Sequence, residues 1–329
     1  MTSIVVILPY FGKLPNYFDF WLSSCKHNPT IDWVLFTDCD TSKLQTASNI
    51  KIINISFDDF RKKIQNYLPF EIALDNPYKL CDYKVIYGLF LKEYIIGYDF
   101  WGYCDCDLIF GNIRKFATED ILSKCDKFLG DGHFSLQRND DPNYWKIIES
   151  TKAKGVYDYQ YIYTHNGNFA FDEYDHLGVS YTYLNFHKDR FYSGFTSDNR
   201  VYDHVHSDIT HFRDKVKDDK KSKKIILYSY KYGQLERLIY ENKLITHEET
   251  LYVHFMKRPM DICTDSTDQY YIAPNKFVTW NENPKFSYMW INGRKKIIDV
   301  RNIKAKLTNI RAALKIGTRY RNIKVKLGI

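Results

Sequence analysis

Two aspartates one residue apart, Asp105 and Asp107, lie in the stretch FWGYCDCDLIFG at residues 100–111, between apolar residues. Carboxylates are costly to place beside buried surface unless their charge is compensated. In an extended segment, residues i and i+2 point to the same side, so both carboxylates can bind one hard divalent cation. Mg²⁺ or Mn²⁺ at this place would neutralise the pyrophosphate of a nucleotide. The alternative is a strand-end turn with solvated aspartates.

A second cluster of chemistry-bearing residues lies in LYVHFMKRP, residues 251–259. An apolar segment is followed by His254, and a neutral imidazole is a suitable third ligand for Mn²⁺. Lys257 and Arg258 could bind a leaving diphosphate. Alone, His254 would be interpreted as a core histidine with two solvated basic neighbours. Together with the aspartate pair, we interpret it as a metal ligand.

The stretch YKLCDYKVIYG, residues 78–88, opens a predicted helix and concentrates charge in its first turns. Lys84 could pair with a phosphate or with Asp105, if the fold brings this turn to the ligand-binding edge. An ordinary solvated helix face is the alternative.

The stretch HNGNFAFDEYD, residues 165–175, places two acids, Asp172 and Glu173, after an apolar run. Either acid could act as the base that accepts a proton from an acceptor hydroxyl. Acidic clusters on loops are common, so a solvated loop is the alternative.

The elements that would position these residues follow from the apolar patterns. Strands are predicted at 3–8, 32–36, 51–55 and 100–104, and helices at 16–26, at 58–68 with Asp58 or Asp59 as cap, and from Pro77 until Gly97. This order predicts an α/β fold with a doubly wound parallel sheet. Ligands of such sheets lie beyond the carboxyl ends of the strands, where we find residues 9–12, Thr37–Asp38 and Asp105–Asp107.

The second half of the sequence has weaker patterns. Further strands are predicted at 127–130, 133–138, 166–171, 225–230, 237–240 and 251–255, with a turn at Tyr232–Gly233 and a helix at 143–150.

Composition favours one large domain in a reducing compartment. The chain has 329 residues, 44% of them hydrophobic, which is enough for a substantial core. Seven cysteines, an odd number without C-x-x-C spacing, predict free thiols. Cys104 and Cys106 are expected to be small buried residues that point away from the aspartates. We expect no signal peptide, because the N-terminus lacks a basic region and a cleavage site.

Positive charge is concentrated at the C-terminus. Residues 294–329 hold 12 Lys and Arg and one acid, a net +11, so residues 1–293 carry 7 − 11 = −4. This local charge argues against general nucleic-acid binding. Apolar residues recur at spacings of 3 and 4 from Val300 to Leu314, with basic residues between them. The pattern predicts an amphipathic helix on an anionic membrane surface, or else a helix docked on its own domain.

The quoted stretches, with the opening ILPYFGKLPNYFDFWLSSCKHNPTIDWVLFTD, resemble bacterial glycosyltransferases from capsule and surface-polysaccharide clusters, in the GT-A superfamily. The resemblance covers about residues 3–260, is strongest around the D-x-D, and extends more distantly to glycogenin-like and lipopolysaccharide galactosyltransferases. The late motif departs from the glycogenin-like H-x-x-G-x-x-K-P, since Lys257 and Arg258 follow His254 more closely.

The resemblance implies a role for individual residues. It implies base and ribose contacts for Pro9, Tyr10, Phe11 and Asp38, donor sugar and diphosphate contacts for Asp82, Lys84 and Lys257, and Mn²⁺ or Mg²⁺ ligands in Asp105, Asp107 and His254.

We therefore expect a metal-dependent glycosyltransferase that moves a sugar from a nucleotide-sugar, such as a UDP-sugar, to a saccharide or lipid-linked oligosaccharide. Residues 1–293 would form the GT-A domain (1–125 for the nucleotide-sugar, 126–293 for the acceptor). Residues 294–329 would hold the enzyme on the cytoplasmic face of the cell membrane. With inversion, Asp172 or Glu173 would be the base.

Three other classes of protein are alternatives. A sugar-phosphate nucleotidyltransferase would open with a Gly-rich basic loop, which PYFGKLPN matches poorly. A non-catalytic carbohydrate-binding protein would have a similar binding surface but a degenerate site that does not catalyse sugar transfer. A phosphatase of the haloacid dehalogenase type places its D-x-D after the first strand and is disfavoured.

Overall fold

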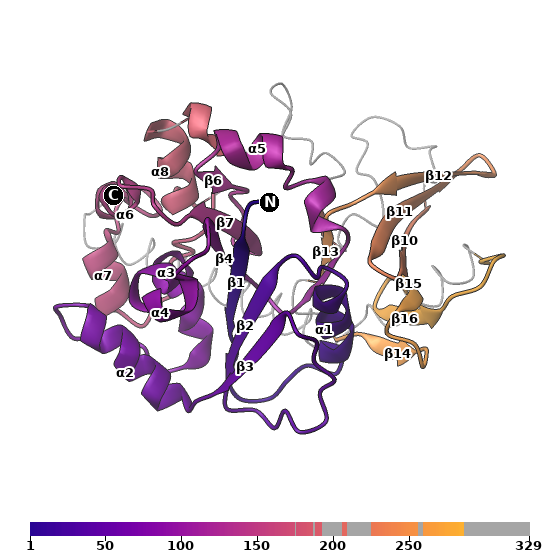
Figure 1. The fold of residues 1–329 in the computed structure, drawn as a ribbon, viewed down its shortest axis with the longest axis horizontal. Coiled ribbons are helices and arrows are strands. Elements are labelled where there is room, and N and C mark those ends of the chain that lie inside the picture. The colour runs from indigo at the N-terminus through magenta and orange to yellow at the C-terminus, as the bar shows by residue number, and fades with distance from the viewer. Residues whose placement is uncertain (175, 187, 193–205, 209–224, 256–258, 286–329) are drawn as a thin grey trace, which may run out of the picture.

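A seven-stranded sheet with helices on both faces forms the centre of the molecule (Figure 1). The computed structural model describes residues 1–174, 176–186, 188–192, 206–208, 225–255 and 259–285. The first nine strands are β1 (Ile4–Pro9), β2 (Asp32–Thr37), β3 (Ile50–Asn54), β4 (Phe100–Cys104), β5 (Leu108–Phe110), β6 (Lys127–Phe128), β7 (Phe134–Arg138), β8 (Phe191–Tyr192) and β9 (His206–Asp208). The later strands are β10 (Ile225–Lys231), β11 (Gln234–Glu241), β12 (Leu244–Glu249), β13 (Tyr252–His254), β14 (Asp261–Cys263), β15 (Gln269–Ala273) and β16 (Lys276–Thr279).

The helices of the described residues are short. The α-helices are α1 (Phe18–Lys26), α2 (Phe57–Tyr67), α3 (Tyr87–Phe90), α4 (Lys92–Ile95), α5 (Glu119–Lys124), α6 (Tyr144–Ser150), α7 (Tyr159–Thr164) and α8 (Val179–Phe186), and the 3₁₀ helices are η1 (Pro77–Ile86), η2 (Ile113–Lys115) and η3 (Lys188–Arg190). Within this part of the chain, none has the length and apolar character that a bilayer crossing requires.

The central sheet has the order β3-β2-β1-β4-β7-β6-β8. β1 pairs in parallel with β2 on one side and with β4 on the other, and β2 pairs in parallel with β3. The chain thus leaves β1 in one direction and later returns to its other side. This confirms the α/β class and a parallel arrangement of β3, β2, β1 and β4, whereas β7 pairs antiparallel with β4 and β6. The strand order creates a topological switch point between β1 and β4.

Alternate residues of β1 anchor two separate cores. Val5 and Ile7 pack with α2, η1 and α6–α8 on one face, whereas Ile4, Val6 and Leu8 pack with α1 and α5 on the other. Because both faces are covered, β1 is apolar throughout, as expected for a central parallel strand.

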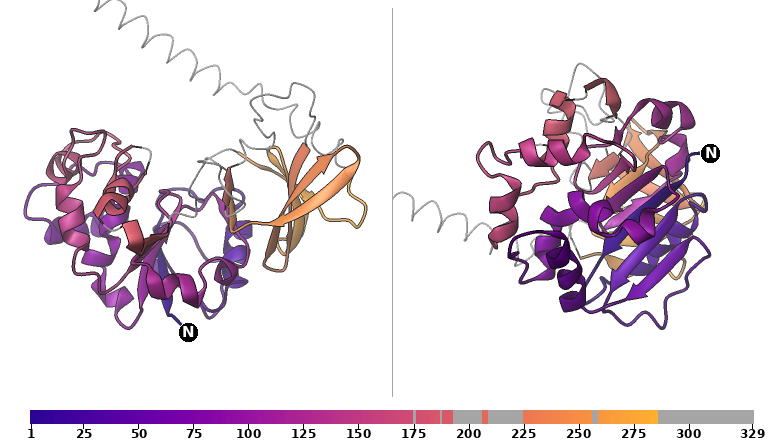
Figure 2. Two further views of the ribbon diagram at one scale, coloured as in Figure 1. Left: turned by 90° about the horizontal axis from the view of Figure 1, so that it is seen from above. Right: turned by 60° about the vertical axis from the view of Figure 1, so that its left-hand side comes forward.

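The segment after residue 225 forms a second, six-stranded sheet of order β12-β11-β10-β15-β16-β14. It lies beside α1 (Figures 1 and 2), and Phe20 of α1 stacks on Phe277 with ring centroids 4.2 Å apart. A turn at Tyr232–Gly233 joins β10 and β11, with positive φ at both residues, as predicted. The sequence predicted only β10 and β11 of these six strands, and not that they form a sheet of their own. The strand predicted at 251–255 is β13, which pairs with β5 instead.

The segment from Pro77 towards Gly97 is helical, as predicted, but it is not one continuous helix. This segment begins as the 3₁₀ helix η1 and continues as two single-turn helices, α3 and α4. In a 3₁₀ helix, residues i and i+3 eclipse. Lys79 and Asp82 have this spacing and form a buried ion pair of 2.7 Å. The 3₁₀ helix in place of an α-helix therefore coincides with this buried ion pair, which the spacing of apolar residues in the sequence does not reveal.

Two further local predictions are wrong. Residues 166–171 form a loop and not a strand, because the backbone N–H groups of Phe169 and Phe171 donate to the Asp82 carboxylate and not to a neighbouring strand. The N-cap of α2 is Ser56 and not an aspartate, since its side chain accepts a hydrogen bond from the Asp59 N–H. Each of the seven cysteines lies in the described residues and is free, as predicted.

Candidate functional site

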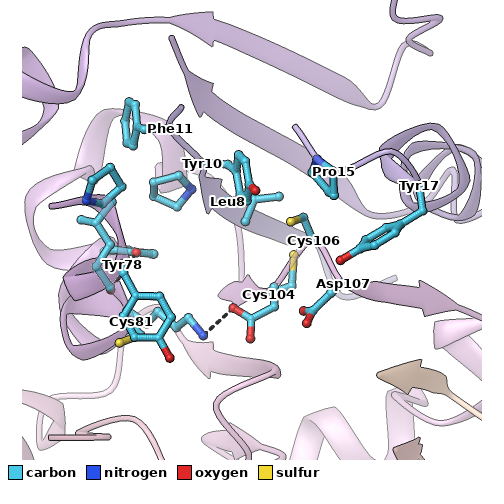
Figure 3. A pocket seen from close by; sticks show the side chains of 16 residues that line it. Leu8, Tyr10, Phe11, Pro15, Tyr17, Tyr78, Cys81, Cys104, Cys106 and Asp107 are labelled. Carbon is cyan, nitrogen blue, oxygen red and sulfur yellow. Dashed lines mark hydrogen bonds and ion pairs between the residues drawn. The ribbon is translucent and has the colours of Figure 1, made fainter. Parts of the chain in front are cut away.

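A pocket of about 430 Å³ opens at the carboxyl ends of β1 and β4, the switch point of the sheet (Figure 3). Its walls come from residues 8–17, from η1 and its cap, and from residues 104–107. Aromatic rings and proline rings line one part, and the carboxylates of Asp105 and Asp107 line another. A cleft with an apolar wall and a few converging charges has the general features of a small-molecule site.

Asp105, Asp107 and His254 form a cluster at this pocket. Each offers one ligand atom, and these atoms all lie within 4.8 Å of one another. β13 brings the histidine to the aspartates, since it pairs antiparallel with β5 and places His254 opposite Leu108. The Phe255 N–H also donates to the Asp107 carbonyl oxygen over 2.8 Å. The combination of these three residues, predicted from the sequence, is thus present in space.

The donor set fits a divalent cation. His254 Nε2 lies 3.3 Å from Asp107 Oδ2, and both side chains are less than a tenth exposed. Two carboxylates and one imidazole suit Mn²⁺, and carboxylates with added water also suit Mg²⁺. A metal ion would compensate the buried charge of Asp107, which answers why a carboxylate is placed there.

Lys84 links the pocket to a second group of acids. Its Nζ lies 2.7 Å from Asp105 Oδ1 and 3.4 Å from Asp172 Oδ2, and it donates to the Gly132 carbonyl oxygen. Burial alone lowers the pKa of Lys84, but the Asp105 and Asp172 carboxylates outweigh it and raise the pKa above its ordinary value. Lys84 is therefore a buried, permanently charged group that holds both carboxylates in place.

Asp172 and Glu173 lie behind Lys84 and do not line the pocket. Both pack against Gly132, where any side chain would collide with the two carboxylates. Burial raises the pKa of Asp172 to about 6, and burial together with the Asp172 charge raises the pKa of Glu173 to about 8. The third acid of this sequence cluster, Asp175, lies outside the described residues.

We expect Glu173→Gln to stabilise the protein at high pH. Glu173 has an ordinary pKa of 4.5 when unfolded and about 8 when folded. Between these values the folded state holds a proton that the unfolded chain has lost, so stability falls as pH rises. The glutamine variant does not titrate. Urea unfolding from pH 5 to 8 should show a gain over the wild type that grows with pH to roughly 1–2 kcal/mol. A constant difference at every pH would contradict it.

The residues expected at the base and ribose divide into two groups. Pro9, Tyr10 and Phe11 line the pocket, and the ring of Phe11 packs on Phe60 of α2 at 5.4 Å. Asp38 does not line it, but its Oδ1 accepts the Gly12 N–H over 2.8 Å. Gly12 has a φ of +97°, a backbone conformation that residues other than glycine adopt poorly. The hydrogen bond to Asp38 therefore holds the loop in this conformation.

Asp82 is placed away from the pocket lining, unlike the donor contact that the resemblance implied. Its carboxylate binds Lys79 Nζ and accepts the N–H groups of Phe169 and Phe171. Lys79 Nζ also lies 4.5 Å from the centroid of the Phe169 ring. Asp82 thus ties η1 to the loop that leads into Asp172.

Several residues around the site were missed by the sequence analysis. The His133 ring lies against the His254 ring, tilted by 34° with centroids 3.7 Å apart, and the His133 carbonyl oxygen accepts the Asp105 N–H. Tyr17 lines the pocket on the side of Asp107 (Figure 3), and burial followed by the Asp107 charge raises the pKa of Tyr17. An isolated His or Tyr gave no pattern that could have revealed these contacts.

Cys104 and Cys106 correct one expectation. Both are buried, as predicted, but they also line the pocket beside the aspartates instead of pointing away from it. The chain bends at residues 106–107, so strict strand alternation does not hold there. Lys257, Arg258 and the basic tail 294–329 lie outside the described residues.

Comparison with known proteins assigns a family and finds distant structural matches. A family model described as "Family of unknown function (DUF6625)" matches residues 6–281. The comparison with curated proteins found no match. The chain is similar to solved structures of glycosyltransferases. A structure of galactosyltransferase LgtC with donor and acceptor sugar analogues matches at 13% identity and a TM-score of 0.27, over 44% of this chain and 62% of that one.

Two further structures match at a similar level. Glycosyltransferase GlyE of Streptococcus pneumoniae matches at 12% identity and a TM-score of 0.32, over 62% of this chain and 48% of that one. Mouse xyloside xylosyltransferase 1 matches at 10% identity and a TM-score of 0.33, over 58% of this chain and 84% of that one. The chain thus spans 62% and 48% of the LgtC and GlyE structures. Because the sequence identities and TM-scores are this low, the proposed function rests on the residues of the site itself.

Proposed function

We propose that this chain, which belongs to the family of unknown function DUF6625, is a metal-dependent glycosyltransferase of the GT-A type that uses a nucleotide-sugar donor. One observation carries the proposal: Asp105, Asp107 and His254 converge within 4.8 Å at a pocket located at the switch point of a parallel sheet. Nucleotides bind at such switch points in open α/β sheets. Two carboxylates and an imidazole are suitable ligands for a divalent cation that also binds a diphosphate.

Different pocket residues would contact different parts of the nucleotide-sugar donor. The rings of Tyr10 and Phe11 form an apolar wall for the base, while Asp105 and Asp107 lie where a diphosphate would be bound through the cation. Bound Mn²⁺ or Mg²⁺ would supply the positive charge that stabilises the departing diphosphate. Lys84 keeps the Asp105 carboxylate in a fixed orientation, and His133 supports the plane of the His254 ring.

Of the two candidate bases, we propose Asp172. A base must be ionised, and Glu173, with its pKa of about 8, is mostly protonated at neutral pH. Because Asp172 is buried behind Lys84 and does not line the pocket, it would act as the base only for an acceptor that reaches it past Lys84. It would then accept the proton of the acceptor hydroxyl, whose oxygen bonds to the anomeric carbon. The bond from that carbon to the diphosphate oxygen breaks, and its electron pair leaves with the diphosphate. A saccharide, free or lipid-linked, would supply the hydroxyl.

Donor hydrolysis tests the proposed function. The protein is incubated with Mn²⁺ and a panel of UDP- and GDP-sugars, and the released nucleoside diphosphate is measured. We expect slow hydrolysis of one donor, abolished by EDTA. A nucleotidyltransferase would instead form pyrophosphate from a nucleoside triphosphate and a sugar phosphate. A carbohydrate-binding protein would catalyse neither reaction, and either result would overturn the proposal.

We also propose that the C-terminal segment holds the enzyme on the cytoplasmic face of an anionic membrane, near a lipid-linked acceptor. The support is the net charge of +11 over residues 294–329 and the apolar stripe of its sequence. We expect the intact chain to float with liposomes that contain anionic lipid. Glutamine at Arg301, Lys304, Lys306, Arg311 and Lys315 should leave most of the chain unbound. Equal flotation of both proteins would refute this role.

A further inference from the structure

The six-stranded sheet has two different faces. Alternate residues of β10 and β15, among them Tyr228, Tyr230 and Tyr270, pack toward α1 in one apolar core. The intervening residues point to the opposite side, where Leu227, Leu238 and Tyr271 form a smaller cluster with Trp280 packed against it. The second face therefore carries its own aromatic group, away from the core.

This outer face is hollowed by a cavity of about 280 Å³, near the lower end of small-molecule pockets, roughly 300–1,000 Å³. The strands that form it are β10, β11, β12 and β15, on the right of Figure 1. Its lining combines the aromatic rings of Tyr271 and Trp280 with polar side chains. The polar side chains include Lys231, Glu236, His247 and Glu282.

Tyr271 and Trp280 form the aromatic part of this lining, which we call the platform, and in it Tyr271 is buried and Trp280 is the partly exposed ring. The two rings are nearly parallel, with an interplanar angle of 11° and centroids 6.4 Å apart. Two contacts fix the platform: the Tyr271 hydroxyl donates to the Asn281 carbonyl oxygen over 2.7 Å, and Lys231 Nζ lies 4.8 Å from the Trp280 centroid. The electron-rich faces of such rings attract the C–H groups on the apolar face of a pyranose.

The polar groups around the platform suit a neutral ligand. Lys231 carries one positive charge, and Glu236 and Glu282 carry two negative charges, so these three residues contribute a net charge of about −1. This balance disfavours phosphates and nucleic acids, which need positive charge. Glu236 also pairs with His247, with 3.0 Å between Oε2 and Nδ1. The rings are therefore surrounded by both hydrogen-bond donors and hydrogen-bond acceptors. Charged residues are depleted at the centre of protein interfaces, so a protein partner fits less well.

We infer that the outer face of the six-stranded sheet is a carbohydrate-binding site for neutral, hydroxyl-rich sugar rings. It is separate from the pocket at the switch point, and no residue lines both. In the context of the proposed function, it would hold a saccharide chain whose end is the acceptor. Its binding needs neither metal nor donor, so its failure and the failure of the transferase proposal are distinguishable.

Binding of the intact chain to an array of defined neutral and anionic oligosaccharides tests the site, with EDTA present and without nucleotide. Calorimetry then gives the affinity for the strongest ligand. We expect neutral pyranose oligosaccharides to bind and Trp280→Ala to weaken binding by about tenfold or more. Trp280→Phe should retain much of the affinity, because a ring remains. Tyr232→Ala is the matched control, since this exposed aromatic does not line the cavity.

Three results would overturn the inference. The first is that no neutral saccharide binds, and the second is that Trp280→Ala binds as tightly as the wild type. The third is that Trp280→Ala changes the oligomeric state in light scattering while no saccharide binds, which would make this face a protein interface.

Discussion

Asp107→Asn is expected to abolish Mn²⁺ binding and to reduce donor hydrolysis by about a thousand-fold or more. The Asp107 side chain is almost fully buried and lies 3.3 Å from the His254 imidazole. Asparagine keeps its shape but removes the negative charge that compensates a cation. Loss of the metal forfeits several kcal/mol of charge stabilisation, and each factor of ten corresponds to about 1.4 kcal/mol.

Calorimetry with Mn²⁺ and the hydrolysis assay together check this expectation. Asp120→Asn is the matched control, because Asp120 is an exposed acid on α5, paired with Lys124. The control should behave as the wild type does. Unchanged Mn²⁺ affinity in Asp107→Asn would show that the aspartate is not a ligand.

Asp82→Ala is expected to lower the free energy of unfolding by about 3–5 kcal/mol, although Asp82 does not line the pocket. The substitution leaves the Lys79 ammonium, which is 2% exposed, without its 2.7 Å partner. It also removes the acceptor of the Phe169 and Phe171 N–H groups, and buried donors without acceptors are costly. Urea unfolding measures the loss.

Glu93→Ala is the control for this stability prediction. It breaks an exposed ion pair with Lys63 of 3.2 Å, and such pairs contribute about 0–1 kcal/mol. A second variant, Lys79→Met with Asp82→Leu, removes both charges but still leaves the two N–H groups without their acceptor. We expect it to recover only part of the loss. Equal losses for Asp82→Ala and Glu93→Ala would contradict the assignment.

The parallel part of the fold and the metal cluster could be predicted from local patterns. Continuous apolar runs predict the buried strands β1, β2 and β4, and their carboxyl ends then meet at one edge of the sheet. Asp105 and Asp107 follow β4 directly, so their place at that edge is a consequence of the strand order. His254 could be added because an imidazole after an apolar strand complements two carboxylates.

Several of the remaining errors share one physical origin, which is long-range pairing. Asp82 takes the backbone hydrogen bonds that would have made residues 166–171 a strand, and nothing in either stretch alone reveals this. The contact between the His133 and His254 rings joins residues far apart in sequence. Likewise, β10 and β11 could be predicted from their apolar runs, but the other four strands of the second sheet were not predicted. The grouping of all six into a separate sheet depends on packing against Phe20 and its neighbours.

The central claim is that Asp105, Asp107 and His254 bind a divalent ion that in turn binds a nucleotide diphosphate. Pulsed electron paramagnetic resonance of Mn²⁺ with the protein and UDP tests it most directly. We predict a nitrogen coupling from an imidazole, lost in His254→Ala, and a phosphorus coupling from UDP, lost in Asp107→Asn. Mn²⁺ that binds without either coupling, or that keeps both couplings in the two variants, would contradict the claim.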